Sequence, residues 1–360
     1  MTQAPTPPAQ RDAAIDALRG AALFGVLFEN LQHFASPSYA ELVAGPSATE
    51  WDRLGLGAIR LLCDNKVYLL FAFLFGYGVA LQMLRDARAG AGFVALHLWR
   101  MALLFLIGVG NLLLWSGDIL TTYAALGCLL LPLRRRSDAA LGRIAGALLL
   151  LPGLALAAAA VAAALDPAAR ASLGAAAAEA IYPARQSCFA FAMFALGLAA
   201  GRRRLLSDGV FLGRAARALP WAFGVGLSGN LAFAAIEAAA PPPLGAAALA
   251  REATLAIAAP ALAFAYAVAF LRWARRTRRG AALAAVGRMT LSNYLLQSAL
   301  GTGLVARLGP VHPPAGLLLA LAVFALQALA SALWLARFRF GPLEWLWRSL
   351  AYGRREPLLR

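Results

Sequence analysis

Residues 15–34 read IDALRGAALFGVLFENLQHF, a stretch long and apolar enough to cross a membrane. It nevertheless carries the polar side chains of Asp16, Arg19, Glu29, Asn30 and His33. A charged side chain at the centre of a membrane helix costs roughly 3 kcal/mol even on insertion scales. The question that decides the interpretation of the chain is therefore why a membrane helix holds so many of them.

A helix of this stretch gathers the five side chains on one face. At about 100° per residue, they fall within an arc of about 140°. Such a polar stripe is expected to face the interior of a helix bundle and to mark a functional path, while lipid covers the opposite face. Plainer readings also exist: Asp16 and Arg19 can form a structural ion pair, and Asn30 can hydrogen-bond a neighbouring helix. His33 alone, near the outer surface, is more often an ordinary histidine.

The rest of the chain has the same apolar character. Its 360 residues are 61% hydrophobic, with a mean hydropathy of +0.69. Continuous apolar runs recur, which excludes the alternating pattern of an outer-membrane barrel. The sequence predicts an all-α polytopic membrane protein, a bundle of about ten transmembrane helices. The predicted spans are 15–35, 66–84, 97–116, 119–133, 144–165, 181–200, 218–238, 253–272, 284–305 and 315–336.

The net charge of +16 could indicate a nucleic-acid partner, but its distribution argues against one. With the N-terminus placed in the cytoplasm, 26 of the 33 Lys and Arg residues fall on the inner side of the predicted spans. The positive-inside rule then predicts that both termini are cytoplasmic (N-in/C-in). The expected location is a bacterial inner membrane, with membrane lipid as the surrounding partner. The oligomeric state is left open.

The sequence divides the chain into three regions. Residues 1–14 form a polar, Pro-rich tail that is expected to be disordered. Residues 15–340 form the transmembrane domain, and residues 341–360 form a cytoplasmic interfacial helix and tail.

The three cysteines are widely spaced and lack a CxxC pair, and the three histidines form no metal-binding pair. Neither a disulfide framework nor a metal site is therefore expected.

Two amphipathic segments lie outside the spans. In PLEWLWRSLAY, Pro342 suits a first helical turn and Gly353 can end the helix. Glu344 and Arg348 are spaced to pair on its polar face. On the outer side, residues 51–62 place apolar side chains at helical spacing, which predicts a helix on the membrane surface, with an ordinary solvated loop as the alternative.

Other polar residues fall near the ends of predicted spans. They are Asp64, Asn65 and Lys66 at the second span, Asn111 and Asp118 around the end of the third, and Arg288, Asn293 and Gln297 in the ninth. Helix ends are where polar groups cost least, so their position alone is weak evidence for a site.

Three stretches together resemble one family. They are IDALRGAALFGVLFEN, DNKVYLLFAFLFGYGVALQ and the C-terminal pair GRMTLSNYLLQS and FRFGPLEWLWRSLAYG. This pattern resembles the YeiB-like bacterial membrane proteins, a domain-of-unknown-function family. The resemblance spans nearly the whole chain and implies a membrane location and fold more firmly than an activity.

The first span is also similar to that of transmembrane acyltransferases, in which an Arg is followed after ten residues by a catalytic His. Here Asn30 stands at that position after Arg19, as in the heparan-glucosaminide acetyltransferase branch. That branch is taken to use a later His, which His33 resembles by position. The resemblance implies transfer of an acetyl group from acetyl-CoA to a small-molecule or sugar acceptor.

The residues can be assigned to this reaction. The catalytic candidates are His33 as base, Glu29 or Asp64 as its orienting carboxylate, and Asn30 as an oxyanion donor. The candidates for contacting the coenzyme are Arg19, Lys66, Arg288 and Asn293, with Lys66 also a candidate oxyanion donor. A transporter that uses the polar stripe as a route, and a non-catalytic membrane partner protein, stay open as alternatives.

Overall fold

A computed structural model describes residues 12–34, 39–88, 92–239, 242–277, 279–308 and 311–360, so most of the N-terminal tail lies outside the described residues. Every regular element in these ranges is a helix, and an isolated antiparallel bridge joins Phe338 to Leu359. Seven helical segments of the described residues are long and apolar enough to cross a membrane. The chain is therefore an all-helical, multi-pass membrane protein.

Helices cover all ten predicted spans, but the first, fourth and ninth are not among the seven. α1 (Ala13–Phe34) carries the polar stripe. α6 (Leu120–Leu129) has ten residues, a length of about 15 Å against the roughly 30 Å of the hydrocarbon core. The predicted ninth span is two helices, because the chain leaves the helical conformation at Met289. The count of ten crossings thus stays a prediction.

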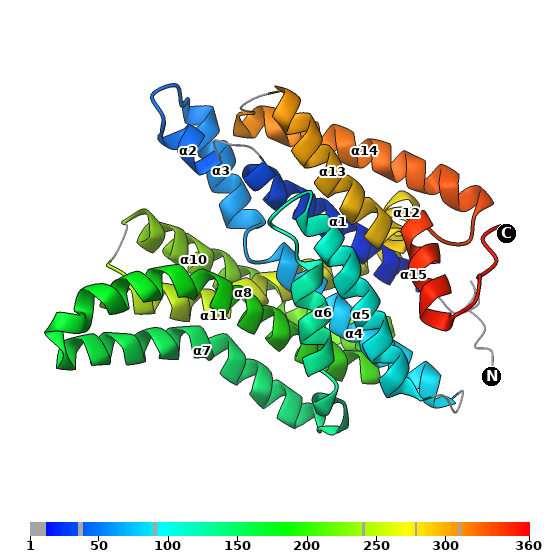
Figure 1. The fold of residues 1–360 in the computed structure, drawn as a ribbon, viewed down its shortest axis with the longest axis horizontal. Coiled ribbons are helices and arrows are strands. Elements are labelled where there is room, and N and C mark those ends of the chain that lie inside the picture. The colour runs from blue at the N-terminus through cyan, green and yellow to red at the C-terminus, as the bar shows by residue number, and fades with distance from the viewer. Residues whose placement is uncertain (1–11, 35–38, 89–91, 240–241, 278, 309–310) are drawn as a thin grey trace. The chain divides into compact units, whose positions relative to one another are not determined.

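The helices form two compact units, the first of which comprises residues 1–67, 82–128 and 270–360. Its remaining helices are α2 (Tyr39–Ala44), α3 (Glu50–Leu62), α5 (Phe93–Leu112), α12 (Ala281–Arg288), α13 (Thr290–Leu308), α14 (Pro313–Arg337), α15 (Pro342–Tyr352) and the ends of α4 (Val67–Arg88) and α11 (Ala246–Thr277). α1 packs against α12, α13 and α14, and α5 packs against α15 (Figure 1).

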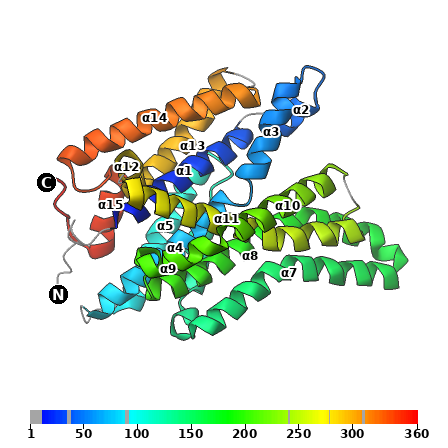
Figure 2. The ribbon, with the colours of Figure 1, turned by 180° about the vertical axis from the view of Figure 1, so that it is seen from behind.

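The second unit comprises residues 68–81 of α4 and residues 129–269. Its helices are η2 (Pro132–Arg135), α7 (Asp138–Leu165), η3 (Pro167–Ala169), α8 (Arg170–Arg202), η4 (Leu205–Ser207), α9 (Gly209–Ala215), η5 (Ala216–Ala218), α10 (Leu219–Ala238) and most of α11. α7 and α8 pack along their length, and Figure 2 shows α10 beside α11. α8 approaches α4 so closely that a side chain at Gly197 would collide with the carbonyl oxygen of Phe73.

The two predicted amphipathic helices are present. α15 begins at Pro342 and ends at Gly353, whose φ of 62° is the left-handed conformation that glycine adopts easily. α3 begins after Thr49, whose hydroxyl accepts a hydrogen bond from the Asp52 amide, and it leaves Trp51 exposed. An exposed apolar stripe on α3 agrees with a helix at a membrane surface.

The predicted pairing of Glu344 with Arg348 is wrong. Glu344 instead accepts hydrogen bonds from the amides of Leu291 and Ser292, at 2.6 and 3.0 Å, and so caps the first turn of α13. Arg348 stacks over the ring of Phe340 at 4.7 Å. The unpaired amide groups at the start of a helix attract a carboxylate, which explains why Glu344 binds there rather than to Arg348.

Within the first unit, the observed contacts join segments that the charge distribution assigns to the same side of the membrane. Arg275 pairs with Asp12 at 2.6 Å, and Arg100 bonds Tyr352; all four residues belong to segments assigned to the inner side. On the predicted outer side, His312 lies 3.1 Å from Asp52. Segments assigned to one side thus contact each other, while which side faces the cytoplasm stays a prediction.

Candidate functional site

α1 is buried all around its axis. Its eleven buried residues are apolar except for Gln32, and they occur on every side of the helix. Protein therefore also covers the face that the sequence assigns to lipid. The polar residues between these positions are half-buried, except for His33, which is exposed. Surrounding protein explains how α1 can carry charges that lipid would disfavour.

The first turns of α1 hold the ion pair that their spacing suggests. Arg19 donates to Asp16 at 2.9 Å, and both side chains keep a minor share of their surface exposed. The backbone of Gly287 in α12 packs against the carbonyl of Asp16, which brings Arg288 to the same end of α1. Charged side chains thus gather at this end in a locally paired arrangement.

At the other end, a tight turn between α3 and α4 brings a second set of polar residues to α1. Asn65 adopts a φ of 63°, a left-handed conformation that asparagine tolerates better than most residues. This turn lets α4 begin at Val67 and presents Asp64 to the last turns of α1. Gln32 donates to the Asp64 carboxylate at 2.8 Å.

We call the residues gathered here the α1–α4 cluster: Glu29, Gln32, His33, Asp64 and Lys66. The Glu29 carboxylate accepts a hydrogen bond from the Asn65 amide and interacts with the charges of Asp64 and Lys66. Lys66 is 1% exposed, and its ammonium donates to the carbonyl of Arg60 at 2.7 Å. Two carboxylates thus face one buried ammonium.

His33 lies at the exposed edge of this cluster. It interacts electrostatically with the Asp64 carboxylate and with the guanidinium of Arg60. Asn30, three residues earlier, is half-buried on the same helix. The catalytic candidates His33, Glu29 and Asp64 therefore come together from distant positions in the sequence, with Asn30 nearby on α1. Asp118, the polar residue near the end of the predicted third span, pairs with Asn111, from which its carboxylate accepts a hydrogen bond at 2.9 Å.

The coenzyme candidates are not brought to one place. Lys66 belongs to the α1–α4 cluster, whereas Arg19 lies 14 residues before His33, about 21 Å along α1. Arg288 donates to the carbonyl of Arg339 at 3.4 Å. Asn293 is buried and donates to the hydroxyl of Ser331 at 3.0 Å, within a polar seam between α13 and α14.

One buried arginine, Arg100, was not identified from the sequence as a residue of interest. Arg100 is 2% exposed and donates to Gln82 at 3.0 Å, to Asp86 at 3.4 Å and to the hydroxyl of Tyr352 at 2.7 Å. It thereby ties α15 to α4 and α5. Gln82 and Asp86 are four residues apart on one helical face, which is a signal that could have indicated a buried partner.

A second missed group lies in the second unit. Arg185 of α8 donates to Glu252 of α11 at 2.8 Å, and both side chains are buried. Arg251 joins Glu252 at 3.2 Å and Glu237 at 2.9 Å. Both arginines are among the seven basic residues that the charge distribution assigns to the outer side, whereas Arg185 lies inside the long helix α8. These four residues form what we call the α8–α11 ion network.

The chain is similar along nearly its whole length to known proteins. Residues 200–354 match the family described as "Protein of unknown function (DUF418)". The uncharacterized protein YxaH of Bacillus subtilis (strain 168) is 32% identical over 99% of this chain and 98% of that protein. The uncharacterized protein YeiB of Escherichia coli (strain K12) is 29% identical over 97% of this chain and 98% of that protein. The chain belongs to the YeiB-like membrane proteins.

A further relative in the YeiB-like family is an uncharacterized 39.9 kDa protein of Bacillus acidopullulyticus, 28% identical over 97% of this chain and 96% of that protein. No solved structure matches the chain significantly. The DUF418 region starts at the end of α8 and ends after α15, so the α1–α4 cluster precedes it. The YeiB-like relatives, by contrast, cover the cluster as well.

Proposed function

We propose that this integral membrane protein is an acyltransferase of the bacterial inner membrane, with both termini in the cytoplasm. It would move an acetyl group from acetyl-CoA to an envelope acceptor such as a sugar. The observation that carries the proposal is that the exposed imidazole of His33 interacts electrostatically with the carboxylate of Asp64, which Gln32 holds by a 2.8 Å hydrogen bond. A base with an orienting carboxylate is what deprotonation of a hydroxyl or amine requires.

The chemical steps follow from this pair. His33 removes the proton from the acceptor, whose oxygen or nitrogen then forms a bond to the thioester carbonyl carbon. Asn30 and the ammonium of Lys66 donate to the oxyanion that develops. The carbon–sulfur bond breaks, and the imidazolium of His33 returns the proton to the leaving thiolate.

The charges around His33 support this role. Partial burial and the guanidinium of Arg60 disfavour the imidazolium, and the Asp64 carboxylate stabilises it. Glu29 bonds the Asn65 amide and so holds the α3–α4 turn, and with it Asp64, against α1. Glu29 is therefore a positioning residue in this proposal, and Asp64 is the residue that orients the base.

The position of the coenzyme follows from the length of α1. We place its phosphates near Arg19 and Arg288, at the end of α1 assigned to the cytoplasm. The thioester must then reach His33, about 21 Å along the helix. An extended arm running beside α1 is the arrangement that joins these two ends.

The experiment is release of CoA from acetyl-CoA by protein reconstituted into vesicles with candidate envelope sugars. His33→Ala should lower turnover by about 10²-fold or more, because a general base contributes at least that much. His312→Ala is the matched control, since His312 also lies beside a carboxylate, Asp52, at 3.1 Å. The control should keep full turnover, and both variants should still bind CoA in calorimetry.

Other outcomes separate the alternatives. Unchanged turnover in His33→Ala would remove this histidine from the mechanism, and a parent protein that does not bind CoA would end the acyltransferase proposal. Uptake of a polar solute into the vesicles without loss of acetyl-CoA would instead identify a transporter. Neither activity, together with a stable complex with another membrane protein, would identify a non-catalytic partner.

A further inference from the structure

The second unit contains a cavity of about 370 Å³. This volume lies within the range of roughly 300–1,000 Å³ that small-molecule sites occupy. α8, α9, α11 and residues 68–81 of α4 line it, with Phe73, Met193, Leu196, Phe211 and Phe264 among its walls. Of the described side chains that line it, only Asp138 and Arg203 carry charge, so the cavity is apolar except at one end.

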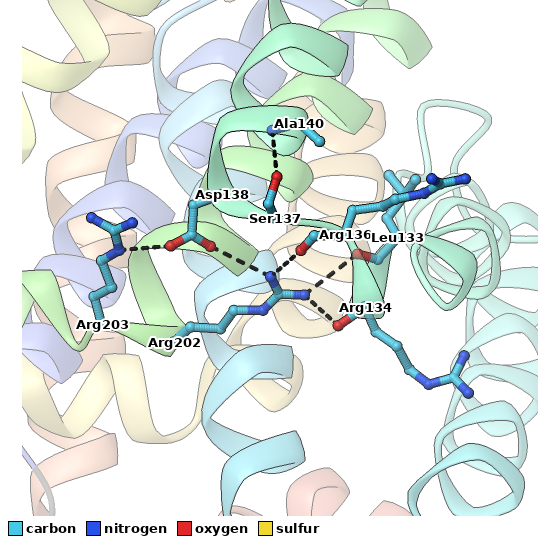
Figure 3. Close-up of polar contacts among 8 residues, drawn as sticks. All are labelled: Leu133, Arg134, Arg136, Ser137, Asp138, Ala140, Arg202 and Arg203. Atoms are coloured by element: carbon cyan, nitrogen blue, oxygen red, sulfur yellow. Dashed lines mark hydrogen bonds and ion pairs between the residues drawn. The ribbon is translucent and has the colours of Figure 1, made fainter.

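The charged end is built by the start of α7 and the end of α8 (Figure 3). The Ser137 hydroxyl accepts a hydrogen bond from the Ala140 amide at 3.2 Å and so caps α7, which fixes Asp138 in the first turn. The Asp138 carboxylate then accepts from the Nε of Arg203 at 2.6 Å and from Arg202 at 3.4 Å.

The two arginines have different roles at this end. Arg202 also donates to the carbonyl oxygens of Leu133, Arg134 and Arg136, so the backbone uses up its hydrogen-bonding groups (Figure 3). Arg203 is 64% exposed, and in the described part of the chain only its Nε is bonded. Its two terminal nitrogens therefore remain available to a ligand.

The charge of this end favours an anion. One carboxylate, Asp138, faces two guanidinium groups, which leaves a net positive charge. More arginines flank it in the sequence: Arg134, Arg135, Arg136 and Arg204. A guanidinium binds a phosphate through paired hydrogen bonds, and basic residues near a membrane surface attract anionic lipids.

The apolar part has the length of a lipid segment. Ten residues of α8 separate Arg203 from Met193, which is about 15 Å, half of the roughly 30 Å hydrocarbon core. A polar solute would leave these apolar walls unmatched, and a purely apolar one would leave the two terminal nitrogens of Arg203 without a ligand. An amphiphile with an anionic head satisfies both ends.

We propose that this cavity holds one acyl chain of an anionic phospholipid, whose phosphate binds Arg203. The chain lies between α8 and α11, and the head group sits at the arginine-rich end of the unit. The proposal does not depend on the acyltransferase activity, because the α1–α4 cluster contributes nothing to this cavity.

The first experiment measures thermal unfolding in detergent with added phosphatidylglycerol or phosphatidylcholine. Phosphatidylglycerol should raise the melting temperature of the parent protein more than phosphatidylcholine does. Ala199→Phe fills the cavity and should abolish the difference, and Arg203→Gln should reduce it. The matched controls are Ala178→Phe, on the exposed surface of α8, and Arg170→Gln, at the exposed start of the same helix, where it does not line the cavity. Both controls should behave like the parent.

A second experiment does not rely on variants that fold. Phosphatidylglycerol with a photoreactive diazirine in its acyl chain should label Met193, Leu196 or Phe264 of the parent protein, as mapped by mass spectrometry. Labelling confined to exposed membrane-facing residues such as Leu150 and Leu154 would overturn the proposal. Equal stabilisation by the two lipids, or an unchanged preference in Ala199→Phe, would overturn it as well.

Discussion

The α1–α4 cluster and the α8–α11 ion network both bury charges among apolar helices, but they balance those charges differently. In the ion network, Arg185 and Arg251 face Glu237 and Glu252, two cations against two anions, with separations of 2.8–3.2 Å. In the α1–α4 cluster, the two carboxylates of Glu29 and Asp64 face the single ammonium of Lys66, and the exposed imidazole of His33 interacts with Asp64.

The comparison separates polar residues that stabilise the fold from polar residues that could bind or react with a substrate. A network in which cations and anions balance has little charge left to offer a substrate, and it links α8, α10 and α11. An unbalanced cluster with an exposed, titratable member can accept a proton or bind a positive or hydrogen-bonding group. Charge balance and exposure, rather than burial alone, therefore indicate which cluster to test for chemistry.

The largest expected effect comes from breaking the balanced network. Arg185→Met removes one of the two arginines that pair with Glu252 and leaves only Arg251. This loss should lower the free energy of unfolding by about 3–5 kcal/mol. The double variant Arg185→Met/Glu252→Met should lose less than the single one, because no uncompensated charge remains. Thermal and denaturant unfolding in detergent measure both.

The control for this test is an exposed pair. Arg53→Met removes the partner of Glu50 on α3, where both side chains are largely exposed, and should cost less than about 1 kcal/mol. A single Arg185 variant as stable as the Arg53 variant would show that the network does not stabilise the second unit.

An intermediate effect is expected in the unbalanced cluster. Lys66→Met removes its one buried cation and the hydrogen bond to Arg60, and should cost about 1–3 kcal/mol. Adding Glu29→Gln removes one carboxylate and should restore part of that loss. If the second change makes the protein still less stable, Glu29 and Lys66 do not compensate each other and the comparison fails.

The smallest effect concerns Glu344, whose carboxylate forms no ion pair with the cations of the described ranges. Burial raises the pKa of Glu344 above its ordinary value of 4.5, although the hydrogen bonds from Ser292 and Leu291 act in the opposite direction. Glu344→Ala removes the cap of α13 and should cost about 1 kcal/mol, as helix caps do.

The raised pKa also predicts a pH dependence. The folded state holds the Glu344 proton more tightly than the unfolded chain, so stability should fall as the pH rises from 4.5 to the raised folded value. Glu344→Gln cannot titrate and should lack this part of the slope in unfolding experiments. Identical slopes in the parent and Glu344→Gln would show that this carboxyl does not contribute.

Much of the fold could be predicted, because apolar runs and the residues that start or end helices act through their neighbours in the sequence. Apolar runs located the helices, and Pro342 and Gly353 marked the ends of α15. The break between α12 and α13 was missed because what stabilises the start of α13 is Glu344, more than 50 residues later. A local pattern contains no information about such a partner.

The site could be predicted only in part for the same reason. The topology brought Asp64 and Lys66 to the same end as Glu29 and His33, since all of them lie at helix ends. Rotation of each helix about its axis decides which side chains meet, and the sequence does not specify it. Gln32 as the partner of Asp64, and Arg185 as the partner of Glu252, depend on that rotation.

The cap on α13 also imposes an order on the synthesis of the chain. Leu291 leaves the ribosome 53 residues before Glu344, the residue whose carboxylate its amide will bind. At roughly 5–20 residues per second, that gap lasts about 3–10 s. During this interval the first turn of α13 must find other hydrogen-bond acceptors, such as water or lipid head groups. A chain that stops before α15 would keep that turn permanently in its nascent state.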